Sequence, residues 1–134
     1  MARKHLILRS VAAPVLGYVT IVLATSFGFA PLGGIIHLDA PLRIHLLATL
    51  VAIGAGLAGG MVAAMIAPSR PLLHATAVLL LLAVDTTGVL LTPSPDPWWF
   101  ELGGSATLMI CTVMGGWLYA VMKQRTSAKT SPAI

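Results

Sequence analysis

The sequence predicts an all-α fold, an integral membrane four-helix bundle of up-down topology with both termini in the cytoplasm. Of its 134 residues, 57% are hydrophobic and 9% are charged, whereas a soluble domain carries about 25% charged residues to face water. Four apolar runs also reach the length of about 20 residues that a helix needs to cross a hydrocarbon core of about 30 Å. These two observations, together with a one-sided distribution of basic residues, predict the fold class.

The four predicted spans are separated by residues that end helices. They cover residues 11–30, 45–67, 72–92 and 100–122. The breaks between them hold Pro31 with Gly33 and Gly34, then Pro-Ser-Arg-Pro, then Pro-Ser-Pro-Asp-Pro, which are turn-forming combinations. Each span is predicted to be helical, because a helix satisfies its own backbone groups in lipid and no alternating barrel pattern is present. Residues 123–134, rich in Ser, Thr and Lys, are predicted to form a short disordered cytoplasmic tail of this single transmembrane domain.

The first run has an alternative interpretation as a signal peptide, because basic residues precede it and small residues stand near its end. However, the run is longer than the usual apolar core of about 7–15 residues. Pro31 would also follow the cleavage point directly. A retained first helix is therefore favoured.

Basic residues predict the orientation, since they are retained on the cytoplasmic side of a membrane. Seven of the eight lie on one side of the predicted spans: Arg3, Lys4, Arg9, Arg70, Lys123, Arg125 and Lys129. Arg43 falls on the other side, together with three of the four acidic residues. Both termini are therefore predicted to be cytoplasmic. The net charge of +4 is explained by orientation, so no nucleic-acid partner is expected.

Small residues recur at four-residue spacing in two of the spans. The second span holds Gly56, Gly59 and Gly60, and the fourth holds Gly115 and Gly116. Small residues on one helix face let a partner backbone approach closely, and this contact supplies much of the attraction between helices in lipid. These glycines are predicted helix-packing residues at the centre of the bundle. Contact within one chain and contact between two chains are both compatible with the pattern.

The chain also contains a candidate internal repeat. Residues 41–67 and 97–123 align without a gap, which places Gly59 and Gly60 on Gly115 and Gly116. A duplicated two-helix unit would be a parallel repeat. Because the first and third spans do not align, biased composition is the alternative explanation.

One acidic residue lies well inside a predicted span. Asp85, followed by Thr86 and Thr87, is about seven residues from the outer end of the third span, or about 10 Å at 1.5 Å per residue. An ionisable side chain at that depth is costly and is a functional candidate by default. The alternative is a structural role, in which a threonine, a carbonyl, Arg43 or His45 satisfies the carboxyl group. Asp85, Thr86 and Thr87 form the candidate intramembrane polar site.

Motifs for catalysis, metals and cofactors are weak or absent. The outer loops gather His37, Asp39, His45, Asp96 and Glu101. These are acceptable metal ligands, but their spacing matches no metal motif. A single cysteine excludes a disulfide framework, and no phosphate-binding loop, nucleophile motif or dinucleotide fingerprint is present. No catalytic, metal-binding or cofactor-binding residue is assigned, and an enzyme is not expected.

The segment 59–75 reads GGMVAAMIAPSRPLLHA and carries the one resemblance to known proteins. It resembles uncharacterised small bacterial inner-membrane proteins, in which a GGxxAAxIA helix end precedes a basic-proline turn and a His-Ala helix start. The resemblance implies a four-helix, multi-pass protein of the bacterial inner membrane and brings no activity, ligand or catalytic residue. Small multidrug transporters share the size and helix count, but they rely on an acidic residue in the first helix, where this chain has none.

Three function classes remain as expectations. The favoured one is a structural or accessory membrane protein that acts in the lipid bilayer through helix–helix contacts, as a homodimer or with a membrane-protein partner. The alternative is a small dimeric transporter or channel that uses Asp85. A membrane enzyme or redox protein has the least support, because neither a catalytic constellation nor a pair of inward histidines for haem is visible.

Overall fold

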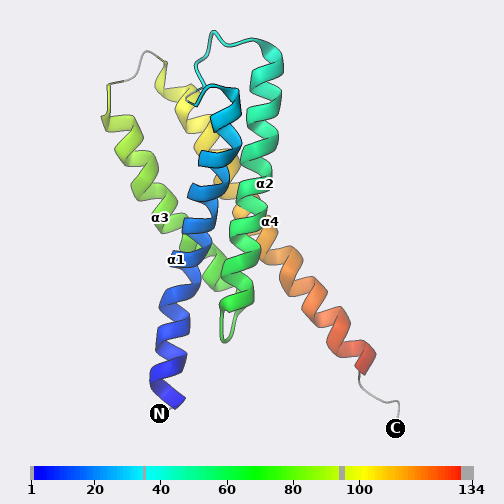
Figure 1. Ribbon diagram of the computed structural model, residues 1–134. Helices are drawn as coiled ribbons and strands as arrows, with labels where there is room; N and C mark the ends of the chain where they lie inside the picture. The colour runs from blue at the N-terminus through cyan, green and yellow to red at the C-terminus, as the bar shows by residue number, and fades with distance from the viewer. Residues whose placement is uncertain (1, 35, 94–95, 131–134) are drawn as a thin grey trace.

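The computed structural model describes residues 2–34, 36–93 and 96–130, and within them the chain is all-helical (Figure 1). Its helices are α1 (Ala2–Phe29), α2 (Leu42–Ile66), α3 (Pro71–Leu91) and α4 (Trp98–Thr130), and a 3-10 turn, η1 (Ala30–Leu32), follows α1. All four α-helices are long and apolar enough to cross a membrane. The prediction of four apolar helices of spanning length is therefore confirmed.

Proline and glycine define where the helices begin and end. Gly33 and Gly34 have φ values of +103° and +86°, in a left-handed region that residues with side chains rarely adopt. The Gly34 N–H donates to the carbonyl of Phe29 at 3.0 Å, which closes the end of α1. α2 begins directly after Pro41, and α3 begins at Pro71, where a missing N–H costs little because the first N–H groups of a helix have no intrahelical partner.

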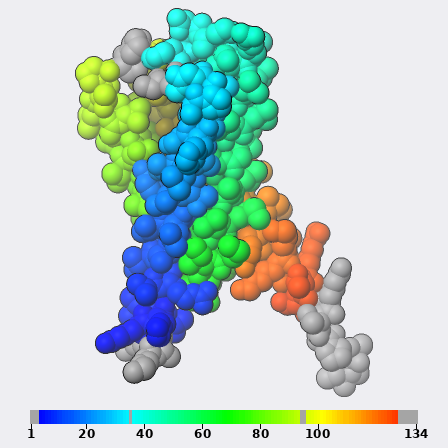
Figure 2. Space-filling model, viewed as in Figure 1, coloured from blue at the N-terminus to red at the C-terminus, as the bar shows by residue number. Residues whose placement is uncertain are grey.

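Helices α1 and α4 extend beyond the predicted spans 11–30 and 100–122, whereas α2 and α3 end close to 45–67 and 72–92. α1 begins at Ala2 and α4 continues to Thr130. The added turns are rich in Lys, Arg, Leu, Gln and Ala, which favour helix. The tail predicted as disordered from residue 123 is therefore helical to Thr130, and residues 131–134 of that prediction lie outside the described residues. The orange-red end of α4 projects away from the other helices in Figures 1 and 2.

Helix α2 contacts the three other helices more extensively than α3 does, and its contact with α4 is the most extensive in the molecule. Its buried residues are all alanine or glycine: Ala52, Ala55, Gly56, Gly59, Gly60, Ala63 and Ala64. By contrast, Leu46, Leu47 and Leu50 of the same helix are exposed. Large apolar side chains can face lipid at no cost, so the interior of the bundle selects small residues that allow close backbone approach.

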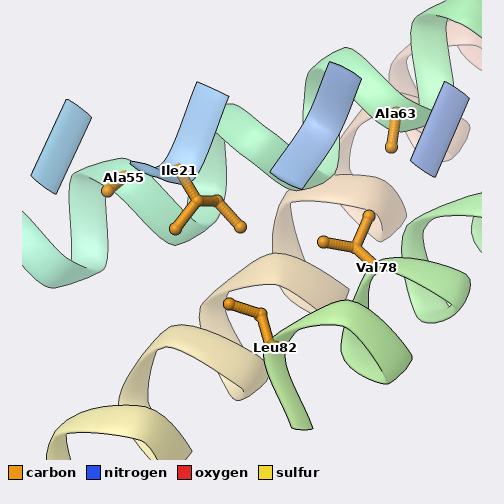
Figure 3. Close-up of a cluster of buried hydrophobic side chains, with 5 residues drawn as sticks. All are labelled: Ile21, Ala55, Ala63, Val78 and Leu82. Carbon is orange, nitrogen blue, oxygen red and sulfur yellow. The ribbon is translucent and has the colours of Figure 1, made fainter. Parts of the chain in front are cut away.

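A cluster of buried apolar side chains holds α1, α2 and α3 together. It contains Ile21 of α1, Ala55 and Ala63 of α2, and Val78 and Leu82 of α3, which point toward one another in Figure 3. The buried positions of α3 end at Leu82. Beyond that point the yellow-green half of α3 leans away from α1 and α2 in Figure 1. This divergence leaves an open groove between α1 and α3.

Candidate functional site

Asp85 lies on α3 one turn beyond Leu82, at the place where α3 diverges from the bundle. Val78, Leu82 and Asp85 follow each other at spacings of four and three, so they share one face of the helix. Val78 and Leu82 are buried in the core cluster, whereas Asp85 is exposed. The inward face of α3 therefore continues from a packed core to a carboxyl group in open space.

Tyr18 of α1 lines the same open space as Asp85 of α3. Tyr18 is half-buried and packs against the core cluster, which fixes its position. A phenol can donate one hydrogen bond, and a carboxylate can accept several.

A groove of about 620 Å³ lies beside this pair, and it is open rather than enclosed. Its lining consists of Tyr18 from α1 and, from α3 and the residue after it, Leu81, Val84, Asp85, Gly88, Val89 and Thr92. The Thr92 hydroxyl donates to the Gly88 carbonyl at 2.9 Å, so its hydrogen is already used within the turn. The groove thus combines apolar walls with one carboxylate and one phenol.

Thr86 and Thr87 do not belong to this groove. The Thr86 hydroxyl donates to the Leu82 carbonyl at 2.7 Å, and the Thr87 hydroxyl donates to the Ala83 carbonyl at 2.8 Å. Consecutive helical residues point about 100° apart, so three adjacent polar residues cannot all face one space. The structure separates Asp85 from its two neighbours and brings Tyr18 to it instead.

Tyr18 was not predicted as a site residue from the sequence, although one feature of the sequence points to it. Aromatic rings in membrane proteins prefer the two interfaces, and a tyrosine in the middle of the first apolar run departs from that preference. His45, foreseen as a partner for Asp85, lies elsewhere. Its Nε2 is 3.2 Å from the Leu38 carbonyl oxygen, and its ring packs edge-on against Phe100 with centroids 5.6 Å apart.

A second polar contact joins the loop after η1 to the segment before α4. The Leu38 N–H donates to Asp96 Oδ1 at 2.8 Å, and His37 Nδ1 lies 2.7 Å from Asp96 Oδ2. The Leu38 N–H and then His37 lower the pKa of the Asp96 carboxyl below its ordinary value of 3.8. Within the described part of the chain, no three His, Cys, Asp or Glu side chains come together to hold a metal ion. The hydrogen bonds of Asp96 link the two loops.

Gly56, Gly60 and Gly115 lie where α2 crosses α4. A Cβ atom added at Gly60 would overlap the backbone carbonyl oxygen of Thr112, and one added at Gly115 would overlap the backbone of Leu57. At Gly56 it would lie 2.9 Å from the Leu108 carbonyl oxygen. The two helices are in backbone contact here, which leaves no space between them at this crossing.

Gly59 lies against α1, and Gly116 lies against α3. A Cβ atom at Gly59 would lie 2.7 Å from the Gly17 carbonyl oxygen of α1, and one at Gly116 would overlap Ala75 of α3. Gly60 and Gly116 also face each other, since a Cβ atom at Gly60 would lie 3.0 Å from the Gly116 nitrogen. Gly60 and Gly116, which align in the candidate repeat, are thus neighbours in space.

Comparisons with known proteins found no family model, curated protein or solved structure that matches this chain.

Proposed function

We propose that this chain is a multi-pass protein of a bacterial inner membrane, with up-down topology and both termini in the cytoplasm. Seven of its eight basic residues support this orientation under the positive-inside rule. The start of α1, the α2–α3 turn and the end of α4 also lie toward one end of the molecule in Figure 1. The segment 59–75, which resembles small inner-membrane proteins, supports the same location. The opposite end, with the loops near Asp96, is then the outer side.

Its function in this proposal is structural or accessory: it binds a membrane-protein partner through helix–helix contacts. The observation that supports this is that Asp85, inside a helix of spanning length, is exposed and lines an open groove. An acidic side chain in the hydrocarbon region costs about 2.5–3.5 kcal/mol on insertion scales. A partner helix in the groove would shield the carboxylate from lipid.

The closed centre of the bundle also supports a role in contacts. Backbone contact between α2 and α4 at Gly56, Gly60 and Gly115 leaves no space for a pore at their crossing. The polar side chain available for recognition is instead on the flank of the molecule, where another membrane protein can reach it by lateral diffusion.

A small dimeric transporter is the second candidate, favoured by a hollow that continues the groove. This hollow of about 230 Å³ shares Val89 and Thr92 with the groove and is also lined by Asp96 and Glu101. Acidic groups would then lie along a path from the outer loops to Asp85. Such a path suits a cation.

Photocrosslinking in native membranes tests the proposed function. Val84 lines the groove and is 73% exposed, and Leu50 of α2 is a matched control that is 63% exposed outside it. A photoreactive residue at position 84 is expected to give a discrete protein crosslink that disappears in Asp85→Asn, and the same residue at position 50 is expected to label lipid.

Crosslinks to lipid alone from both positions would contradict an accessory role. A cation flux in liposomes that Asp85→Asn abolishes would contradict it too, and would support the transporter.

A further inference from the structure

We propose that the groove between α1 and α3 binds a transmembrane helix of another protein that carries a lysine or arginine opposite Asp85. This inference rests on the proposed accessory function and specifies the chemistry of the partner.

The shape of the groove suits a helix that approaches from the side. Leu81, Val84 and Val89 provide an apolar wall, which can replace lipid contacts with protein contacts. A Cβ atom added at Gly88 would meet nothing within 4 Å, so α3 presents bare backbone at the floor of the groove. Small residues at such a position allow close helix–helix approach in membranes.

The charge of the groove selects a basic side chain. Ionisable groups inside membranes pair with opposite charges or with polar groups, and the lining of the groove includes no basic side chain. Lysine and arginine have apolar stems that pack along apolar surface while the charged head reaches outward. Such a stem can lie along Leu81 and Val84 with its head at Asp85.

A second copy of this chain offers no such group at this depth. The sequence has no lysine or arginine between Arg9 and Arg43 or between Arg70 and Lys123. A symmetric contact through the groove would place the two Asp85 side chains together, and like charges at close range are unfavourable. The complementary charge must therefore come from a different protein.

Synthetic spanning helices test this chemistry directly. Three polyleucine peptides, one with lysine six residues from its end, one with glutamate there and one with leucine only, are incorporated with the full chain into phosphatidylcholine vesicles. Binding is measured as energy transfer from a fluorophore at the carboxyl terminus of the chain to an acceptor on the peptide. The lysine peptide is expected to bind about 3- to 30-fold more tightly than the others, on the scale of polar contacts between membrane helices.

Two variants and a matched control locate the binding. Asp85→Asn is expected to remove the preference for lysine, and Gly88→Leu is expected to fill the groove and weaken binding of the lysine peptide. Gly54→Leu is the control, because a Cβ atom added at Gly54 of α2 would also meet nothing within 4 Å and Gly54 lies outside the groove. It is expected to bind like the unmodified chain.

Several outcomes would overturn the proposal. Equal binding of the lysine and leucine peptides would do so, as would a lysine preference that survives Asp85→Asn. Self-association that Gly88→Leu abolishes, without lysine preference, would assign the groove to a second copy. Asp85-dependent binding of tetraphenylphosphonium, without lysine preference, would assign it to a small lipophilic cation.

The native crosslink separates this inference from the function on which it rests. An Asp85-dependent crosslink from position 84 without a lysine preference would overturn the basic partner and leave the accessory role standing. Loss of both results would overturn both.

Discussion

Replacement of Gly60 by alanine adds one methyl group where the backbones of α2 and α4 are in contact, and this addition is expected to lower the stability of the bundle. The methyl group would overlap the Thr112 carbonyl oxygen, which is backbone and cannot rotate away. The helices must separate, and overpacking of this kind costs about 1–3 kcal/mol. A gap of about 0.5–1 Å already loses a quarter to a half of the dispersion energy of each separated contact.

The gain in helix propensity when alanine replaces glycine contributes little to the stability of a bundle in a bilayer. Alanine favours helix over glycine by about 1 kcal/mol in water, but helices separated within a bilayer keep their backbone hydrogen bonds and stay helical. The propensity difference then affects both states alike. We expect Gly60→Ala to destabilise the bundle by about 2 kcal/mol, near the middle of the overpacking range.

Titration with SDS in mixed micelles, followed by tryptophan fluorescence, measures this change. Gly60→Ala is expected to unfold at a lower SDS fraction than the unmodified protein. Gly54→Ala is the matched control, because its methyl group meets nothing within 4 Å, and its midpoint is expected to stay unchanged. Equal midpoints for both variants would refute the backbone contact between α2 and α4.

Three further predictions concern single side chains. Asp96→Asn is expected to speed hydrogen exchange of the Leu38 amide several-fold, because the amide loses a charged acceptor at 2.8 Å, and unchanged exchange would contradict that bond. Because the Leu38 N–H and His37 lower the pKa of Asp96 in the folded protein, this link stabilises the loops above pH 3.8 and is lost as the pH falls through the lower folded pKa. The difference in exchange rate between the unmodified protein and Asp96→Asn is expected to vanish at that low pH. The buried thiol of Cys111 is expected to react with a membrane-permeant maleimide only after SDS separates the helices, and rapid labelling beforehand would argue against its burial. Thr112→Val is expected to change stability by less than about 1 kcal/mol, because the hydroxyl donates only within its own helix, at 2.7 Å; a larger loss in the SDS titration would reveal an interhelical role.

The spanning helices were predictable because their causes are local. Apolar runs of spanning length and the prolines between them are visible in the chain itself, and they placed α2 and α3 closely. Helices α1 and α4 were predicted shorter than they are, because the boundary of an apolar run is not the boundary of a helix. Charged residues such as Lys4 and Lys123 lie outside the hydrocarbon run and still continue the helix.

Hydropathy along the chain was sufficient to place Asp85 within an apolar helix of spanning length, but the space that its side chain faces depends on how the helices pack. Each residue turns a helix by about 100°, so the direction of Asp85, Thr86 or Thr87 depends on how α3 is rotated about its axis. Packing of Val78 and Leu82 against α1 and α2 sets that rotation. The divergence of α3 then opens the groove, and Tyr18 joins its lining from a helix that is distant in sequence, which no local pattern encodes.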